Sequence, residues 1–270
     1  MTDAVPDPRA LESLLAFWRD AGVDACYGDA PIDHTHVKPT PSLKAVAKIS
    51  AAVVPASPGA DVGEALAEAR RLAAGAATLQ DLAGAVAAFE GCPLRAMGAT
   101  QAVFGRGDPN APVLIIGEGP GADEDRLGQP FVGKAGQLLD RMLEAAGLTG
   151  RVFITNTVFW RPPGNRTPNP QEQAVCAPFV ERAFAILRPK AVLLLGAAAT
   201  KSVLQTDEGI MRVRGQWRDW RLAEGAVSAP VMPTLHPAFL LRQPLAKRQA
   251  WADILSLAAR LDAAEVESKG

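Results

Sequence analysis

Four short apolar runs rich in β-branched and aliphatic residues constrain the fold of this chain more than any other feature. They are Val113–Gly117, Val152–Asn156, Ala191–Gly196 and Val231–Leu235. Helical periodicity follows the first run over residues 136–146 and the second over 171–187. Strands that alternate with helices pair in parallel and are covered on both faces. We therefore expect a three-layer αβα fold around a central, mainly parallel four-stranded sheet.

The N-terminal part differs in composition from this region. A helical pattern in residues 11–18 is followed by a Pro-, Gly- and Asp-rich stretch over 28–62 that predicts an irregular connection. Two Ala-rich helical patterns occupy 63–89. We expect a helical and irregular extension over 1–80 and an α/β domain over 81–270.

Composition limits the class of protein. Of the 270 residues, 48% are hydrophobic, which is enough for a full core. No stretch approaches the roughly 20 apolar residues of a membrane span, and the acids and prolines near residue 1 argue against a secretory signal. The widely spaced Cys26, Cys92 and Cys176 make a poor disulfide framework and favour a reducing cytoplasm.

The loop after the first run is rich in glycine and acids. It reads GEGPGADEDRLGQPF and places Asp123 and Glu124 where the third glycine of a dinucleotide-binding pattern would fall. A nucleotide-binding α/β enzyme of another class is thereby disfavoured, although it stays an alternative. A loop that merely caps the next helix is the structural alternative.

Polar residues also stand at the ends of the second and fourth runs. Asn156 closes the second and His236 follows the fourth. Ligands bind at the carboxyl ends of parallel strands, so both side chains should meet Glu118 in one site. An amide offers a donor and an acceptor to a base edge. The alternatives are a turn-forming asparagine and a structural histidine.

Basic residues gather in segments that lack acids. The formal net charge of −1 excludes a chain coated in positive charge, but a local basic strip is enough to hold a polyanion. Such segments follow Asn156 and occupy 182–206 and 225–252. The cations in these segments include Arg161, Arg166, Arg188, Lys190, Lys201, Arg242, Lys247 and Arg248.

Three long blocks of the chain resemble the type-4 (thermophile-type) uracil-DNA glycosylases of the uracil-DNA glycosylase superfamily. They contain GEGPGADEDRLGQPF, NTVFWRPPGNR and LHPAFLLR, in this order, within roughly residues 89–257. The resemblance implies a monofunctional DNA-repair glycosylase that hydrolyses the N-glycosidic bond of uracil in DNA and leaves an abasic site. It implies uracil-containing DNA as partner, and we expect a cytoplasmic monomer. A catalytically weak damage-binding module on the same fold stays an alternative.

The resemblance assigns the residues that would bind the base. Phe131 would stack on the extruded uracil, and Asn156 would read its Watson–Crick edge. His236 would contact O2 and stabilise the uracil anion as it leaves. Gly119 would line the sugar.

The resemblance also raises the question of which carboxylate activates water. Better-known relatives place an aspartate where this chain has Gly119. We therefore expect Glu118 or Glu124 to orient the water or to stabilise the cation-like sugar.

Contacts to the DNA duplex are implied for two segments. Leu240, Leu241 or Phe239 of HPAFLLR would press into the duplex. Arginines would hold phosphates, namely Arg161, Arg166 and Arg242.

The family usually holds a [4Fe-4S] cluster with four cysteines. Cys92 and Cys176 match two of them, whereas Phe89 and Trp160 stand at the other two positions. A cluster requires thiolate ligands, which aromatic rings cannot replace. We therefore expect no metal and no cofactor, with apolar packing of the two rings in the volume of the cluster.

Overall fold

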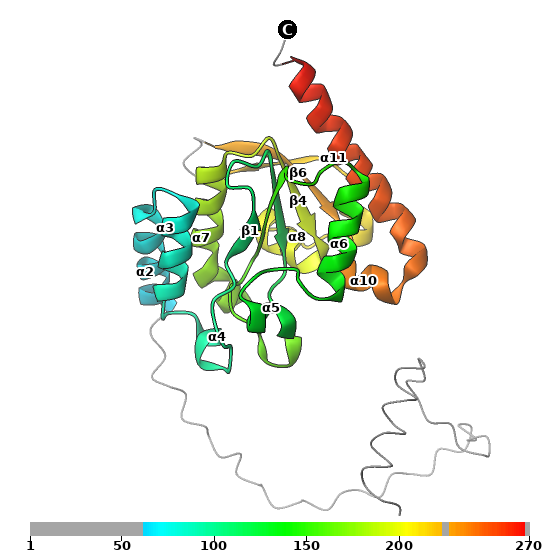
Figure 1. Ribbon diagram of the computed structural model, residues 1–270. Helices are drawn as coiled ribbons and strands as arrows, with labels where there is room; N and C mark the ends of the chain where they lie inside the picture. Colours follow the sequence, from blue (N-terminus) through cyan, green and yellow to red (C-terminus); the bar gives the residue numbers. More distant parts are fainter. Residues whose placement is uncertain (1–61, 223–226, 268–270) are drawn as a thin grey trace, which may run out of the picture. The chain divides into compact units, whose positions relative to one another are not determined.

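The computed structural model describes residues 62–222 and 227–267, which form a mixed sheet between two layers of helices (Figure 1). Six strands lie in the order β1-β3-β2-β4-β6-β5. The four central strands are parallel and correspond to the four apolar runs: β2 Val113–Gly117, β3 Val152–Asn156, β4 Ala191–Leu195 and β6 Ser228–Thr234. The expected parallel core is confirmed.

Two short antiparallel strands extend the sheet beyond the expected four. β1 (Gly105–Gly107) pairs with β3, and β5 (Arg218–Arg221) pairs with β6. Both are edge strands of three or four residues with polar or glycine-rich sequences. They lack an apolar pattern because only part of their surface is buried.

The residues of each central strand alternate between two hydrophobic cores. Leu114 and Ile116 face one core, and Val113 and Ile115 face the other. The helices α2 (Val62–Gly75), α3 (Leu79–Ala88), α7 (Pro170–Leu187) and α8 (Gly196–Leu204) cover the first core. The second is covered by α6 (Lys134–Ala145) and α11 (Lys247–Glu267). The three-layer arrangement follows from this alternation.

The domain boundary expected at residue 80 needs correction. Ala65, Ala69 and Ala73 of α2 are buried in the same core as the strands, and Figure 1 shows α2 beside α3 and α7. The α/β domain therefore includes α2. The Ala-rich pattern predicted the helix correctly but not its attachment, because a small-residue helix face gives little sign of what it packs against. The helix expected near residues 11–18 lies outside the described residues.

Short helices complete the domain and lie within the segments that connect the longer helices and strands. They are α4 (Pro93–Ala96), α5 (Ala122–Leu127), α9 (Ile210–Val213), α10 (Pro237–Arg242) and the 3₁₀ turns η1 (Pro163–Asn165) and η2 (Pro244–Ala246). Within the described ranges, no helix has the length and apolar character needed to cross a bilayer.

Candidate active site

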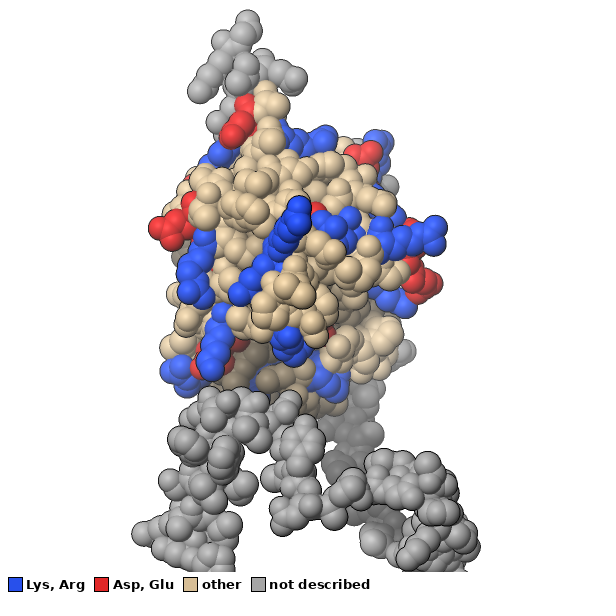
Figure 2. Space-filling view, turned by 90° about the vertical axis from the view of Figure 1, so that its right-hand side faces the viewer, with Lys and Arg blue, Asp and Glu red and all other residues tan. Residues whose placement is uncertain are grey.

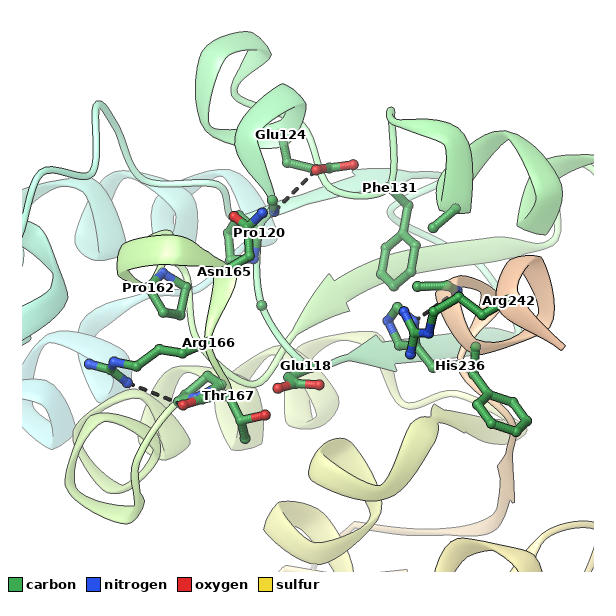
Figure 3. A pocket seen from close by; sticks show the side chains of 16 residues that line it. Glu118, Pro120, Glu124, Phe131, Pro162, Asn165, Arg166, Thr167, His236 and Arg242 are labelled. Atoms are coloured by element: carbon green, nitrogen blue, oxygen red, sulfur yellow. Dashed lines mark hydrogen bonds between the residues drawn. The ribbon is translucent and has the colours of Figure 1, made fainter. Parts of the chain in front are cut away.

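A pocket of about 490 Å³ opens at the carboxyl ends of the parallel strands (Figure 3). Three of the four expected loops line it, namely those that follow β2, β3 and β6. The fourth, after β4, continues directly as α8 and does not line the pocket. The residues that line it include Glu118, Gly119, Glu124, Phe131, Arg166, His236, Phe239 and Arg242.

Asn156 lies beneath this pocket with an unsatisfied amide. Asn156 is 1% exposed. Its side-chain oxygen, Oδ1, is buried and has no hydrogen-bond partner among the described residues. The residue pairs with Gly117 across β2 and β3. A Cβ at Gly117 would stand 2.5 Å from Oδ1 and 2.4 Å from the Phe131 ring. A buried polar atom without a partner is costly, so the amide is prepared for a ligand.

Phe131 is held in an unusual backbone conformation above Gly117. Its φ is 57°, a region that bulky residues rarely adopt and that often marks a functional site. Two side chains hold the neighbouring backbone. Arg106 donates to the carbonyl oxygens of Pro130 (2.8 Å) and Phe131 (3.2 Å), and Glu124 accepts from the next amide, that of Val132, at 2.9 Å.

Glu124 is engaged by the loop itself. Its two carboxylate oxygens accept hydrogen bonds from the backbone amides of Gly121, Val132 and Gly133 at 2.8–3.1 Å. These contacts use three of the roughly four acceptor positions of a carboxylate, which leaves little capacity for the activation of water. Glu118, by contrast, has no hydrogen bond to its carboxylate from the described residues, and it lines the same cavity as His236 (Figure 3). The geometry favours Glu118 of the two candidates.

His236 faces the pocket from the N-terminus of α10. Its Nδ1 accepts a hydrogen bond from the backbone amide of Ala238 at 3.1 Å. Burial of the ring, with a smaller contribution from the charge of Arg242, lowers the pKa of His236 to about 4. The neutral ring with Nδ1 as acceptor carries its proton on Nε2, so His236 is a donor on its other side.

The β4 end supports His236 from behind. Gly196 has φ +89°, and a Cβ there would lie 2.9 Å from the Cβ of His236. The glycine thus permits the histidine to approach the strand end closely. The ring centroids of His236 and Phe131 are 5.7 Å apart. Phe131 and His236 therefore meet from two loops, and Asn156, the last residue of β3, lies next to them.

The two arginines after β3 are engaged by neighbouring side chains. Arg161 donates to Asn165 Oδ1 at 2.7 Å. Arg166 forms two hydrogen bonds, of 2.8 and 2.5 Å, with the carboxylate of Glu172, whose side chain is fully buried. Burial raises the pKa of Glu172, but the hydrogen bonds from Arg166 and the backbone of Asn169 outweigh it and lower the pKa overall. Arg166 thus fastens the pocket wall to α7.

Of the two leucines expected to enter the duplex from the HPAFLLR segment, the structure exposes only one. Leu240 is 1% exposed and packs in a core cluster with Leu138 and Leu235, so the expectation that it enters the duplex is corrected. Leu241 is 41% exposed, and Leu245, which the sequence reasoning missed, is 95% exposed. Leu245 lies on η2, directly after α10. A leucine between Pro and Ala carries no sign of such exposure in the sequence.

Unpaired cations lie on the face covered by α6, α10 and α11. Figure 2 shows Lys and Arg side chains spread across this face, with acids mainly at its edges. The exposed residues are Lys134, Arg141, Arg242, Lys247 and Arg248, and none forms an ion pair within the described residues. We call these five residues the basic face. Lys134 and Arg141 were missed because neither lies in a basic segment: Lys134 is an isolated cation, and Asp140 and Glu144 lie on either side of Arg141.

Three other cations of the acid-free segments do not belong to the basic face. Arg188 and Lys190 directly precede β4 and therefore lie at the edge of the sheet opposite the pocket. Lys201 pairs with Asp207 at 2.6 Å. Sequence proximity to a strand did not show at which end of the strand a residue lies.

An aromatic cluster fills the region that the cysteines share. The Phe89 ring centroid lies 5.2 Å from that of Phe179 and 6.3 Å from that of Trp160, and all three residues are at most 2% exposed. Cys92 and Cys176 are the thiols in the described part of the chain. Burial raises the pKa of Cys176, and the hydrogen bond that Cys176 donates lowers the pKa of Cys92.

These residues do not fit a four-thiolate cluster. Within the described ranges, no group of three or more His, Cys, Asp or Glu side chains is arranged to hold a metal ion. Phe89 and Trp160 occupy the remaining two positions with rings that cannot bind iron.

Comparison with known proteins agrees with this geometry. Residues 104–255 match the family described as the Uracil DNA glycosylase superfamily. The type-4 uracil-DNA glycosylase of Thermotoga maritima is 40% identical over 153 residues, which cover 56% of this chain and 77% of the relative. The type-4 enzyme of Pyrobaculum aerophilum is 38% identical over 181 residues, or 65% and 91% of the two chains. That of Sulfurisphaera tokodaii is 42% identical over 151 residues, or 54% and 68%. Because the family match covers more than half of its residues, this chain belongs to the uracil-DNA glycosylase superfamily.

Proposed function

We propose that this protein removes uracil from DNA by hydrolysing the bond between the base and deoxyribose, as a monofunctional glycosylase. The observation that carries the proposal is the unpartnered amide of Asn156 beneath a pocket that also holds a neutral histidine donor. A base inside a duplex must be rotated out before such a pocket can read it. The names of the similar proteins support uracil as that base.

The hydrogen-bonding groups match uracil. Uracil presents an N3–H donor beside the O4 acceptor, and an asparagine amide offers an acceptor beside a donor. Asn156 Oδ1, which has no partner among the described residues, would accept from N3–H. Phe131 would stack on the ring.

His236 would stabilise the leaving group. When the N1–C1′ bond breaks, the bonding electrons go to uracil and negative charge develops on O2. The Nε2–H of His236 would donate to this oxygen, and a donor placed in advance stabilises charge that exists only in the transition state. The histidine acts as a hydrogen-bond donor and stays neutral, because its pKa of about 4 makes a charged form scarce at pH 7.

Glu118 would act on the sugar side of the bond. The deoxyribose becomes cation-like as uracil departs, and a nearby carboxylate can stabilise it and orient the water that attacks C1′. Glu118 lines the pocket beside Gly119, where a Cβ would stand 2.9 Å from the side chain of Val158, so this wall has no room for a larger residue. Glu124 would order the loop that carries Phe131.

DNA would approach across the basic face. Arg242 lines the pocket and belongs to this face, so phosphates beside the flipped nucleotide would contact it, with Lys247 and Arg248 further along α11. Leu241 and Leu245, both exposed next to Arg242, would contact the bases beside the vacated position. Arg161 and Arg166 would shape the wall.

The reaction would proceed without an iron–sulfur cluster, since the described residues supply two thiols and an aromatic cluster where four thiolates would be needed. We also propose that the protein acts in the cytoplasm as a monomer.

A gel assay on a uracil-containing oligonucleotide tests the proposal. The parental protein should create alkali-labile abasic sites at uracil, and not at cytosine or thymine. Asn156→Ala should lose roughly 1–3 kcal/mol of recognition, or about 5- to 150-fold in rate, because the uracil edge is left unpaired. Asn110→Ala, at an exposed turn outside the pocket, is the matched control.

Two outcomes would contradict the proposal. Binding to uracil-containing DNA without excision would support a damage-binding module. Parental excision rates in Asn156→Ala would show that this amide does not read the base.

A further inference from the structure

Two thiols lie side by side in the core, outside the pocket and unused by the proposed reaction. The Sγ atoms of Cys176 and Cys92 are 3.9 Å apart, and the residues are separated by 84 positions in sequence. Cys92 directly precedes the short helix α4, and Cys176 lies within α7. Both are at most 1% exposed. The contact therefore joins two elements that the chain itself does not connect closely.

We propose that Cys92 and Cys176 form an oxidation site, at which a disulfide ties α4 to α7. A disulfide has a sulfur–sulfur distance of about 2.05 Å, so the two atoms must approach by roughly 2 Å. Rotation of both side chains, with a small shift of the four-residue α4, can supply this movement. Each thiol has the other as its neighbour, and no third thiol lies in the described part of the chain to compete for it.

We expect a small peroxide to reach the pair from the side of Cys92, once the segment around it opens. Glu90 and Arg95 on either side of Cys92 are exposed, and Gly91 and Pro93 are half-buried. The Cys92 thiol therefore lies just under the surface, whereas Cys176 is covered on α7. Local opening of the segment around α4 would expose Cys92 first.

The oxidation balances with hydrogen peroxide as the oxidant. The Cys92 sulfur attacks one peroxide oxygen, the O–O bond breaks, and one water leaves a sulfenic acid at Cys92. The Cys176 sulfur then attacks the Cys92 sulfur, the S–S bond forms and the S–O bond breaks. The thiol proton and the departing hydroxide make the second water. Two thiols are oxidised to one disulfide, and one peroxide is reduced to two waters.

The cross-link would stabilise the region that supports the pocket wall. Glu172, which holds Arg166, lies one turn before Cys176 on α7. A disulfide that closes a long loop reduces the entropy of the unfolded chain and slows the loss of α7 packing. Because neither cysteine lines the pocket, the excision rate at 25 °C should stay the same while heat inactivation slows.

The full-length Cys26→Ser variant tests the proposal, since it leaves only the two buried thiols. The folded protein is treated with hydrogen peroxide, quenched with catalase, and unfolded in N-ethylmaleimide. The expected product is lighter by two hydrogens, carries no maleimide, and yields a tryptic cross-link between peptides 72–95 and 167–182. Its melting temperature should rise by roughly 5–15 °C. Reductant should reverse the shift, and Cys92→Ser should show none.

Three results would overturn the proposal. In the first, both thiols still react with maleimide after the peroxide treatment. In the second, the product gains oxygen atoms but contains no cross-link. In the third, the cross-link forms only when denaturant is present during oxidation. Each readout is a mass or a melting temperature, so it is independent of uracil excision.

Discussion

At the scale of single residues, the site depends on the way in which neighbours fix the protonation and orientation of polar groups. His236 gives its Nδ1 lone pair to the amide of Ala238, and burial keeps the ring neutral. As a result, the Nε2–H of His236 is the group that can donate a hydrogen bond to a ligand. Asn156, by contrast, presents an acceptor, because its Oδ1 has no hydrogen-bond partner among the described residues. One residue is prepared to donate and the other to accept.

Loss of the His236 donor should slow excision strongly. Removing one preorganised donor to a developing anion typically costs about 100- to 1000-fold in rate, so His236→Ala should lose that much in single-turnover assays. His236→Gln keeps an N–H and should retain part of the rate. Thermal melts of both variants are the control for correct folding. Equal excision rates in His236→Ala and the parent would show that the histidine has no part in the mechanism. A drop explained by unfolding would assign it a structural role.

The pH dependence follows from the lowered pKa of His236. The folded pKa of about 4 lies below the ordinary value of 6.5, so the unfolded chain binds more protons between these values. The histidine therefore destabilises the fold as pH falls from about 6.5 toward 4, and has no effect on stability above that window. Single-turnover excision should show no titration of His236 between pH 6 and 8. An apparent pKa near 6.5 that disappears in His236→Gln would contradict this result.

At the scale of elements, the loop between β2 and α6 is built around its own carboxylate. Glu124 lies on α5 and accepts amides from both ends of the loop, at Gly121 and at Val132 and Gly133. Arg106 of β1 holds the same loop from the edge of the sheet. Together they maintain the left-handed backbone at Phe131. The edge strand that the sequence did not reveal thus supports the residue that would stack on uracil.

Glu124→Ala should therefore loosen the Phe131 loop. Loss of a charged acceptor typically costs about 2 kcal/mol, which corresponds to a melting temperature lower by roughly 4–8 °C. The KM for uracil-containing DNA should rise, because the stacking ring is no longer fixed. Asp123→Ala removes a neighbouring, exposed carboxylate paired with Arg126 and is the matched control. If Glu124→Ala instead lowered only kcat with an unchanged melting temperature, Glu124 and not Glu118 would be the residue that acts on water.

At the scale of the whole molecule, charge is distributed unevenly although the formal net charge is only −1. The basic face adjoins the pocket through Arg242, whereas the acids of Glu118 and Glu124 lie inside it. This arrangement places phosphates outside and the base inside. Arg188 and Lys190 at the opposite edge of the sheet should take no part in binding.

The salt dependence of DNA binding tests this distribution. Each phosphate contact contributes about 0.9 to the slope of log K against log salt concentration. Lys247→Gln with Arg248→Gln should reduce that slope by about 1.8 if each holds one phosphate. Arg188→Gln with Lys190→Gln changes the net charge equally and should leave the slope unchanged. Equal effects of the two pairs would show that binding depends on net charge alone.

The absence of a cluster is also a whole-molecule prediction. Protein purified under reducing conditions should be colourless and contain no stoichiometric iron. Cys92→Ser with Cys176→Ser should keep most of its stability and excision activity there, because a buried free thiol behaves as a small apolar group. Brown protein with about four irons per chain would show that a residue outside the described ranges, such as Cys26, completes a site.

The sequence by itself determined the central sheet and the meeting point of the site residues. Apolar runs of β-branched and aliphatic residues marked β2, β3, β4 and β6, because strands buried on both faces must be apolar along their whole length. Once those strands are parallel, their carboxyl ends share one edge, which brings Glu118 and His236 to one pocket and Asn156 beneath it. The resemblance to uracil-DNA glycosylases then supplied the substrate, which periodicity cannot supply.

Only the tertiary structure decided which members of each motif are available. Leu240 and Leu241 are neighbours in sequence, yet one is buried in a core cluster and the other is exposed. Glu118 and Glu124 lie in one loop, yet three backbone amides engage only Glu124. Periodicity reports which residues prefer burial, whereas these distinctions depend on contacts between segments distant in the chain. Such contacts form only when the strands, loops and helices are packed together.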